Sequence, residues 1–300
     1  MELSYVIEGE NLYKKYRGFH LDVSKLQVPK GFATALIGEN GAGKTTLLNI
    51  LAGIRLDYKG QLRYFGQYSD KDREENPLVK EAIGYTGPGD YYLPHWKIRQ
   101  VEEISSLLFD KFSGEKFRKW CVDLNIIKDE KDRGKKVSAL SDGNRMKLMI
   151  AGVMARETSL LLMDEPASPL DPLMRDRLCE MIRNYLCEEE EQRSVLFSTH
   201  NIADMENVTD YAIIMAGGKI AEAGFVEDLK EKYTFVKGEP ADEARARAVL
   251  YTVNTGKYGY EGICLSEKLD QLAGCDIQLE TPSLSQISVA VMKHFNGQRG

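Results

Sequence analysis

Two patterns of hydrophobic and polar positions predict two kinds of strand. Residues 1–32 alternate apolar with polar positions and break at Gly18, as half-exposed strands joined by a turn do. Short runs of consecutive apolar residues follow at 33–37, 159–163 and 194–198, which is typical of buried parallel strands. We therefore expect a small antiparallel β subdomain at the N-terminus, packed beside a core with a mostly parallel sheet.

Apolar residues also recur at helical spacing between these runs. Residues 97–127 are amphipathic and carry no strand signal, so we expect a helical insertion over about 94–158 that stands out from the sheet. One long helix opens after Ser141, and another is capped by Asp171 and runs to about Glu191. Further strands are expected at 60–65, 81–85, 211–215 and 219–223, and a helix at 225–233 closes the core.

The last part of the chain repeats strand and helix patterns on a smaller scale. Strands are expected at 234–237, 250–253 and 259–265, with a helix at 242–249 and a final helix capped by Thr281 and Pro282. Leu284, Ile287, Val291 and Phe295 share one face of that last helix. The chain is thus predicted to be α/β, with a core of residues 1–233 and a C-terminal αβ module of residues 234–300.

A glycine-rich segment, residues 38–46, lies between the run at 33–37 and the next helical stretch. Its spacing is G-x-x-x-x-G-K-T, the phosphate loop of a P-loop NTPase core. Glycines let successive N–H groups turn inward around phosphate oxygens, and the helix N-terminus adds positive charge. We expect Lys44 to reach the β- and γ-phosphates of a nucleotide and Thr45 to bind Mg²⁺. The full set of predicted phosphate-loop ligands is Asn40, Gly41, Ala42, Gly43, Lys44, Thr45 and Thr46.

Two carboxylates and a histidine follow the buried runs. Asp164 and Glu165 come directly after residues 159–163, and His200 comes just after 194–198. Alone, the carboxylates could be an acidic strand cap and the histidine a structural side chain. Beside a phosphate loop, we expect Asp164 to hold Mg²⁺ and Glu165 to orient the water that attacks the γ-phosphate. His200 would contact that phosphate and keep the water in line.

Two further features gain meaning from the phosphate loop. Tyr16 lies 22 residues before Gly38, where its ring could stack on a base, although a lone aromatic more often serves packing. Ser141 caps a helix whose N-terminus could receive an anion, with Gly143 in its first turn, although alone this is only a capped helix.

Composition restricts the classes of partner. The net charge is -6 without Lys/Arg clusters, so the footprint of nucleic-acid binding is missing and we expect no nucleic-acid partner. The start is not a secretory signal, and no window holds eighteen apolar residues in a row, so we expect the chain neither to be secreted nor to span a membrane. Five cysteines with no C-x-x-C pair fit buried reduced thiols better than zinc or disulfides.

Together these residues resemble the ATP-binding subunits of ABC transporters. Residues 38–46 match the Walker A loop, 140–144 the signature usually written LSGGQ, and 160–165 Walker B with its catalytic glutamate. The D-loop corresponds to residues 168–171, Tyr16 to the adenine-stacking aromatic, and His200 to the switch histidine. The tail resembles, more weakly, the C-terminal module of bacterial exporter ATPases that handle antibiotics, lantibiotics or amphipathic peptides.

This sequence departs from the family pattern at two places. Residues 86–88, Thr-Gly-Pro, stand where the family commonly has a glutamine that touches Mg²⁺, which leaves Asp90 or water as substitutes. Asp142 replaces the second glycine of the signature, and its carboxylate should repel a γ-phosphate unless the side chain points away. Since Ser141 and Gly143 are retained, we expect slower or partner-dependent hydrolysis.

The resemblance implies an assembly as well as a reaction. Two chains would pack head to tail around two ATP molecules with Mg²⁺, each Ser141 meeting the nucleotide of the other chain, and hydrolysis would let them separate. The motion would pass to separate transmembrane permease subunits docked near residues 90–96. The chain would then lie on the cytoplasmic face of the cell membrane as a peripheral subunit that drives export of a small hydrophobic compound or peptide.

Two other functions remain as alternatives. A soluble ABC-type ATPase acting on the ribosome or DNA usually has two cassettes, coiled-coil arms or zinc-binding cysteines, whereas this sequence has one phosphate loop, no heptad run and no paired cysteines. A P-loop kinase of small molecules would leave the Ser141 helix and His200 without a function.

Overall fold

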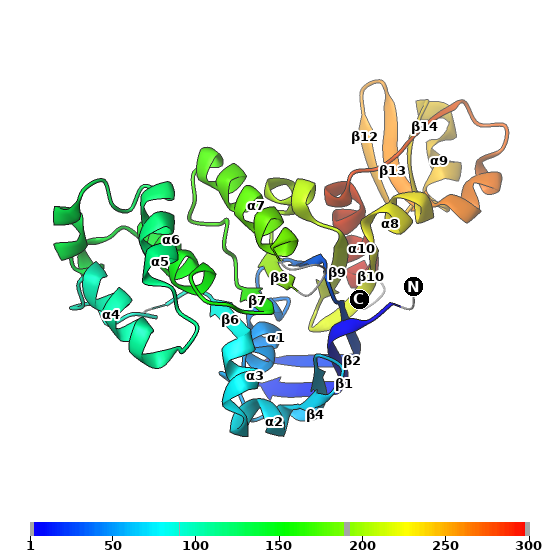
Figure 1. The fold of residues 1–300 in the computed structure, drawn as a ribbon. Helices are drawn as coiled ribbons and strands as arrows, with labels where there is room; N and C mark the ends of the chain where they lie inside the picture. Colours follow the sequence, from blue (N-terminus) through cyan, green and yellow to red (C-terminus); the bar gives the residue numbers. More distant parts are fainter. Residues whose placement is uncertain (1–2, 90, 189–192, 298–300) are drawn as a thin grey trace.

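A six-stranded sheet of order β10-β9-β3-β8-β7-β6 forms the centre of the protein (Figure 1). The structure is a computed structural model and describes residues 3–89, 91–188 and 193–297. In the six-stranded sheet, all pairs of neighbouring strands are parallel except β9 with β10. This confirms the predicted mostly parallel sheet. The strands are β3 (Ala33–Gly38), β6 (Ile83–Thr86), β7 (Leu160–Met163), β8 (Ser194–Thr199), β9 (Tyr211–Ala216) and β10 (Lys219–Phe225).

The parallel register brings the predicted site to one edge of this sheet. Ile37 pairs with Thr199, and Met163 pairs with Phe197, so β3, β7 and β8 end side by side. All residues of these three strands are buried, which explains their continuous apolar runs. Whatever follows each strand therefore meets at its carboxyl end, where open α/β sheets bind ligands.

The predicted N-terminal antiparallel sheet is confirmed, with the order β2-β1-β4-β5. Its strands are β1 (Tyr5–Tyr16), β2 (Phe19–Pro29), β4 (Lys59–Tyr64) and β5 (Tyr68–Ser69). The apolar face of this sheet packs with helix α1 (Lys44–Leu51) in one hydrophobic cluster. The sheet therefore supports the helix that follows the phosphate loop.

Two short helices, α2 (Asp70–Glu75) and α3 (Pro77–Ala82), follow β5. A strand from residue 81 was expected, and this start is wrong. Asn76 caps α3 through a bond from the Leu78 N–H, and Pro77 sits at its first position, so the helix continues to Ala82. The strand begins only at Ile83.

Helices fill the segment that was expected to stand out from the sheet. They are α4 (Ile98–Leu108), α5 (Gly114–Asp123) and α6 (Asp142–Met154), with 3₁₀ turns η1 (Glu130–Gly134) and η2 (Val137–Ala139). Glu102 of α4 is 8% exposed and pairs with both Arg118 and Arg133, which ties α4, α5 and η1 together. Figure 1 shows this group to one side of the central sheet. Its exact limits stay a prediction.

The chain returns to the sheet through α7 (Pro172–Cys187), which Asp171 caps as predicted. The expected end of this helix at Glu191 lies outside the described residues. The 3₁₀ turns η3 (Ile202–Asp204) and η4 (Glu206–Val208) follow β8, and α8 (Val226–Lys232) follows β10.

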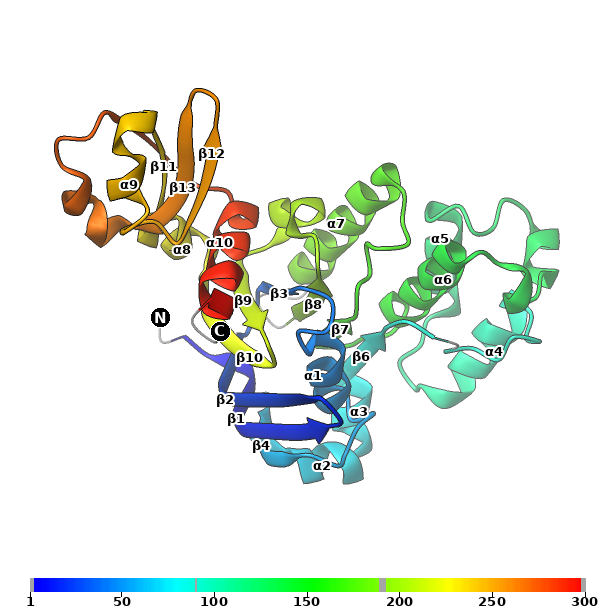
Figure 2. The same ribbon diagram turned by 180° about the vertical axis from the view of Figure 1, so that it is seen from behind.

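A third sheet, of order β12-β13-β11-β14, occupies the C-terminal part. Its elements are β11 (Tyr233–Gly238), η5 (Pro240–Asp242), α9 (Glu243–Ala246), β12 (Thr252–Gly256), β13 (Gly259–Leu265), η6 (Ser266–Leu272) and β14 (Ile277–Glu280). The strand expected at 250–253 begins two residues later. Figures 1 and 2 both show this sheet apart from the central one.

The last helix, α10 (Leu284–Gly297), leaves this third sheet and packs on the central one. The expected cap at Thr281 and Pro282 is wrong. The Gln286 N–H donates to Ser283 Oγ and the Ser283 N–H donates to Gln286 Oε1, so Ser283 forms a capping box. Buried side chains of α10 belong to the same hydrophobic cluster as those of β9. The C-terminal module is therefore anchored to the core by its last helix.

None of the helices formed by the described residues could cross a lipid bilayer, on grounds of length and apolar character.

Candidate functional site

The phosphate loop, residues 38–46, connects the end of β3 to the start of α1. Gly41 and Gly43 have φ of 84° and 105°, a region that side chains rarely adopt. A Cβ on Gly43 would also lie 2.9 Å from Cζ of Phe19. Glycine is therefore required at 43 by both its conformation and the close approach of Phe19, the first residue of β2.

The loop presents donors to an open space. The first N–H groups of α1, at Lys44, Thr45 and Thr46, precede the first intrahelical bond, which Leu47 N–H donates to the Gly43 carbonyl. Apart from its own chain neighbours, no described residue has an atom within 4 Å of a Cβ position built on Gly41, so the described residues leave this side of the loop unfilled. Thr45 is exposed. Unpaired N–H groups at a helix N-terminus suit phosphate oxygens.

Lys44 is held inside the loop. It is only 5% exposed, and its Nζ donates to the carbonyls of Gly38 at 2.7 Å and Glu39 at 3.2 Å. The same Nζ lies 3.3 Å from Oε1 of Glu165. The structure thus brings the predicted phosphate-binding ammonium to the predicted catalytic carboxylate.

Asp164, Glu165, Ser198 and His200 form a cluster at the ends of β7 and β8, which we call the catalytic corner. Asp164 is fully buried and its Oδ1 accepts from Ser198 Oγ at 2.5 Å, while its Oδ2 is buried with no partner among the described residues. Glu165 Oε2 lies 2.8 Å from Nδ1 of His200. Glu165 also has φ of 50°, an unusual value outside glycine and typical of functional turns.

The free oxygen of Asp164 makes the corner suitable for Mg²⁺. A buried carboxylate oxygen without a partner is costly, and a hard divalent cation is its usual complement. Burial raises the pKa of the neighbouring Tyr85 phenol, and the charge of Asp164 adds to this rise. The residues present therefore fit a metal ion held jointly with phosphate oxygens.

The segment that lacks the family glutamine borders the same corner. The Asp164 N–H donates to the Thr86 carbonyl at 2.7 Å, and Gly87 and Pro88 line a cavity together with Asp164. Neither glycine nor proline offers a side-chain ligand to a metal. Asp90, the substitute suggested by the sequence, lies outside the described residues.

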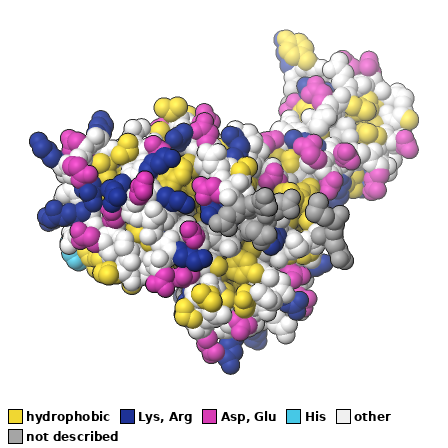
Figure 3. All heavy atoms as spheres, in the orientation of Figure 1, with side chains coloured by type: hydrophobic (Ala, Val, Ile, Leu, Met, Phe, Trp, Pro, Cys, Tyr) yellow, Lys and Arg dark blue, Asp and Glu magenta, His cyan; other side chains and the backbone are white. Residues whose placement is uncertain are grey.

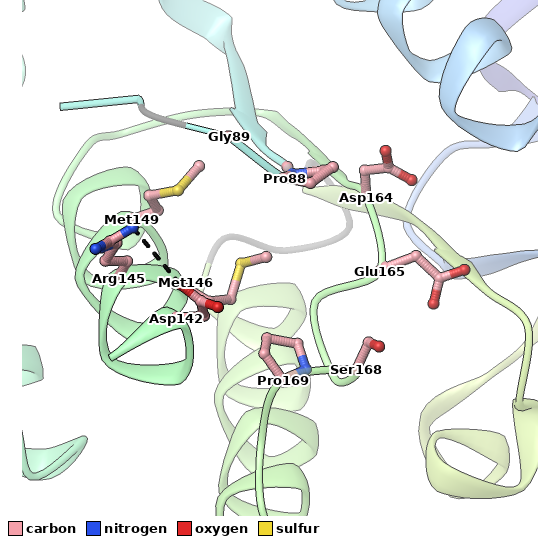
Figure 4. Close-up of a pocket in the computed structure, with 11 residues that line it drawn as sticks. Pro88, Gly89, Asp142, Arg145, Met146, Met149, Asp164, Glu165, Ser168 and Pro169 are labelled. Carbon is pink, nitrogen blue, oxygen red and sulfur yellow. Dashed lines mark ion pairs between the residues drawn. The ribbon is translucent and has the colours of Figure 1, made fainter. Parts of the chain in front are cut away.

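The first turn of α6, residues 141–145, is the signature turn, and it lies across that cavity. The cavity has a volume of about 460 Å³ and is lined by Asp142 and Arg145 on one side and Glu165, Ser168 and Pro169 on the other (Figure 4). Ser141 Oγ accepts from the Asn144 N–H at 3.3 Å, as a helix cap does.

The structure explains why glycine occurs at position 143 of the signature and how aspartate is accommodated at position 142. A Cβ on Gly143 would lie 2.7 Å from the Pro169 carbonyl, so glycine lets α6 approach the D-loop. The Asp142 side chain is 92% exposed and lies 3.5 Å from Arg145, which offsets its charge. The repulsion expected from Asp142 is thereby reduced.

Tyr16 lies at the end of β1 and is linked to the phosphate loop through Phe19, the first residue of β2, which approaches Gly43. Its half-buried ring is 6.3 Å from that of Phe19, between centroids, and the cations of Lys14 and Arg55 lie 5.5 Å and 5.6 Å from its centre. The ring thus sits in a cationic surrounding near the loop. Its role in base stacking stays a prediction.

Sequence reasoning missed Ser198 and Arg175. Arg175 Nε donates to the carbonyls of Ala167 and Leu170 at 3.2 Å and 2.9 Å, and its Nη1 lies 2.7 Å from Asp204. It thereby joins the D-loop to the turn after His200. The sequence signal that could have indicated Ser198 is a polar residue near the end of a buried strand, next to the strand that leads to Asp164. For Arg175, the only sequence signal is its place in the first turn of α7.

Comparison with known proteins gives the family. The ABC transporter family model matches residues 21–168. The uncharacterized ABC transporter ATP-binding protein YxlF of Bacillus subtilis is 31% identical over 231 residues, which cover 74% of this chain and 72% of that protein. The chain belongs to the ABC transporter ATP-binding proteins. This ABC protein is therefore an ATPase that binds ATP and Mg²⁺, as the resemblance predicted.

Other relatives show how far the likeness extends. A probable sulfate/thiosulfate import ATP-binding protein, CysA of Chlorella vulgaris, is 28% identical over 75% of this chain and 93% of its own. The dimeric structure of MJ0796, a bacterial ABC transporter cassette, matches with a TM-score of 0.62 at 22% identity, over 73% of this chain and 98% of that one. The fold of the ABC cassette is thus confirmed, while the relatives do not specify an exporter.

Proposed function

We propose that this ABC ATPase works as a pair of chains that hydrolyses two ATP molecules and drives a separate transmembrane subunit in export. The observation that carries the proposal is the position of Glu165, whose two carboxylate oxygens lie 3.3 Å from Lys44 Nζ and 2.8 Å from His200 Nδ1. A carboxylate between a phosphate-binding ammonium and a histidine is placed to orient a water on a γ-phosphate.

The phosphate loop would bind the triphosphate. Backbone N–H groups from Asn40 to Thr46 would surround phosphate oxygens, and Lys44 would supply positive charge to the β- and γ-phosphates. Tyr16 would stack on the base. The buried position of Lys44 supports this role, because an ammonium that is 5% exposed requires anionic or carbonyl partners.

Asp164 and Thr45 would hold Mg²⁺, which neutralises charge that develops on the phosphates. Oδ2 of Asp164 is the oxygen available for this, since Oδ1 is bonded to Ser198. His200 would keep Glu165 oriented toward the attacking water and contact the γ-phosphate.

A second copy of the chain would complete each site. Ser141 is exposed at the N-terminus of α6, and its Oγ accepts from the Asn144 N–H of the same helix, so its hydroxyl and the helix N-terminus can meet an anion. Gly143 would contact the same phosphate. The structure of MJ0796 is dimeric, which supports a pairing of two chains. In a two-fold pair, each signature turn would face the nucleotide of the other chain.

The transmembrane subunit would dock over α1 and α3. A groove of about 450 Å³ there is lined by Leu56, Ile83 and Tyr85 among others, and Ile54, Leu56 and Leu78 are 59%, 53% and 73% exposed beside it. Figure 3 shows hydrophobic side chains gathered over α3. In the docking region expected at 90–96, Tyr91 and Leu93 are also exposed. The chain would then sit on the cytoplasmic face of the membrane as a peripheral subunit.

Export of a small hydrophobic compound or peptide is the direction we propose, because of the C-terminal module. This module resembles that of bacterial exporter ATPases and is anchored to the core through α10. Affinity purification of this chain from its native membranes, followed by identification of the bound membrane protein, tests the direction. Recovery of an importer permease would contradict export.

Glu165→Gln tests the catalytic proposal. The variant should bind ATP but hydrolyse it about 10²–10⁴-fold more slowly, because the amide cannot act as general base. With ATP and Mg²⁺ it should accumulate as a dimer in sedimentation velocity. Glu103→Gln, at an exposed position on α4, is the matched control and should behave like the wild type. Unchanged turnover in Glu165→Gln would contradict the role of Glu165.

A further inference from the structure

Ser198 lies at the end of β8, directly beside the carboxylates of the catalytic corner. In the parallel pair of β7 and β8, Leu162 pairs with Leu196 and Met163 with Phe197, so the next step places Ser198 next to Asp164. Partners in register point to the same face of a sheet. Ser198 is fully buried, so its hydroxyl has no access to bulk water.

The hydroxyl of Ser198 both donates and accepts a hydrogen bond. A serine hydroxyl has one hydrogen to donate and two lone pairs to accept. Here Oγ donates to Oδ1 of Asp164 at 2.5 Å and accepts from the N–H of Glu165 at 2.9 Å. A single side chain therefore holds the carboxylate of one residue and the backbone of the next.

These two bonds determine how each acidic residue is presented. Because Oδ1 of Asp164 is bonded to Ser198, Oδ2 is the buried oxygen left without a partner among the described residues. The N–H of Glu165 is fixed at the point where the backbone takes φ of 50°, and from there the side chain reaches Lys44 and His200. Loss of the hydroxyl would release both.

We propose that Ser198 is a positioning residue for ATP hydrolysis. It acts through Asp164, by turning Oδ2 toward the metal, and through Glu165, by fixing the backbone from which the carboxylate reaches the attacking water. The inference rests on the proposed roles of Asp164 and Glu165. Both bonds of the Ser198 hydroxyl go to these two residues, so its effect on the reaction is indirect.

Ser198→Ala tests the inference, with Ser194→Ala as the matched control. Ser194 is a fully buried serine of the same strand, and its Oγ accepts from the Gly31 N–H at 2.9 Å, far from the corner. Both variants lose one buried hydroxyl, so a merely structural role would affect them equally. The measurements are Mn²⁺ affinity in the presence of ADP, followed by electron paramagnetic resonance, and the separate kcat and KM for ATP.

We expect Ser198→Ala to bind Mn²⁺ about 10–100-fold more weakly, the usual effect of removing a residue that orients a metal ligand. Its kcat should fall at least as much, with the KM for ATP little changed because the phosphate loop is intact. Ser194→Ala should match the wild type in both assays. Ser198→Thr, which keeps the hydroxyl, should recover most of the Mn²⁺ affinity.

Asp164→Asn in the same Mn²⁺ assay separates this inference from the proposed function. If Asp164→Asn weakens Mn²⁺ binding and Ser198→Ala does not, the positioning role of Ser198 is wrong and the metal site stands. If Asp164→Asn binds Mn²⁺ like the wild type, the metal role of Asp164 is itself wrong. Equal effects of Ser198→Ala and Ser194→Ala would also overturn the inference, since they would indicate packing alone.

Discussion

The catalytic corner and the signature turn differ in how their polar groups are satisfied. In the corner, each functional side chain bonds to a residue from another element: Asp164 to Ser198, and Glu165 to both Lys44 and His200. Each of these contacts joins two segments that are distant in the sequence. The register of the central sheet therefore builds these contacts of the corner within one chain.

In the signature turn, the side chains of Ser141 and Asp142 contact residues three positions further along the same helix. Ser141 Oγ accepts from the Asn144 N–H, and Asp142 pairs with Arg145. Ser141 and Asp142 are exposed, and Gly143 approaches another segment at the Pro169 carbonyl. Within the part of the chain that the structure describes, the turn is thus a formed helix N-terminus with Ser141 exposed, which is why we propose that a second chain completes the site.

Lys44→Ala should break the corner most severely. Charge-assisted bonds to phosphate contribute about 1.5–3 kcal/mol each, so the affinity for ATP should fall by about 10–100-fold. Titration with ATP by calorimetry, in the presence and absence of Mg²⁺, measures this. Lys59→Ala, at an exposed position of β4, is the control. An ATP affinity equal to the wild type would contradict the phosphate-loop assignment.

Ser141→Ala tests the signature turn against a second capped helix. Ser113 caps α5 through the same kind of bond, from the Lys116 N–H at 3.2 Å. Both Ser141→Ala and Ser113→Ala should cost about 1 kcal/mol of stability, the usual effect of losing such a cap. Only Ser141→Ala should also lower kcat, by about tenfold for one hydrogen bond to a charged group. Equal ATPase rates in the two variants would assign Ser141 to capping alone.

Arg175→Ala tests how the corner is connected to the D-loop. It removes two bonds to the carbonyls of Ala167 and Leu170 and the ion pair with Asp204, so we expect the free energy of unfolding to fall by about 1–3 kcal/mol. Hydrolysis should slow several-fold, because the ion pair between Arg175 and Asp204 holds the turn that comes directly after His200. Arg177→Ala, on the same helix but in more exposed ion pairs, should cost at most about 1 kcal/mol in urea unfolding.

Asp142→Gly should have the smallest effect. The carboxylate is 92% exposed and already paired with Arg145, and such surface pairs contribute little. We expect the ATPase rate to change by less than about threefold, as for other exposed charges. A much larger increase in steady-state rate would show that the side chain turns toward the phosphate when the site closes.

The parts of the fold predicted from sequence are those encoded by local patterns. The parallel strands follow from continuous apolar runs, and the phosphate loop from the spacing of Gly38, Gly43 and Lys44 within a single turn. The order of motifs also placed Asp164 and His200 on strands that turned out to be neighbours. Such features depend on residues close in sequence.

The parts that were missed depend on contacts between distant segments. The function of Ser198 requires knowing that β8 pairs with β7 in one exact register. The choice of Ser283 over Thr281 as the cap of α10 is set by the Gln286 side chain. Packing of α10 on β9 was not foreseen either, because its apolar face is equally compatible with the third sheet.

The central claim is that each ATP site is shared by two chains, and the most direct test is the oligomeric state of Glu165→Gln with and without Ser141→Arg. Sedimentation velocity with ATP and Mg²⁺ should give a dimer for Glu165→Gln and for its combination with Ser113→Arg. Glu165→Gln combined with Ser141→Arg should remain a monomer that still binds ATP, because the added side chain blocks the turn. A dimer of equal stability in that last variant would contradict the shared site.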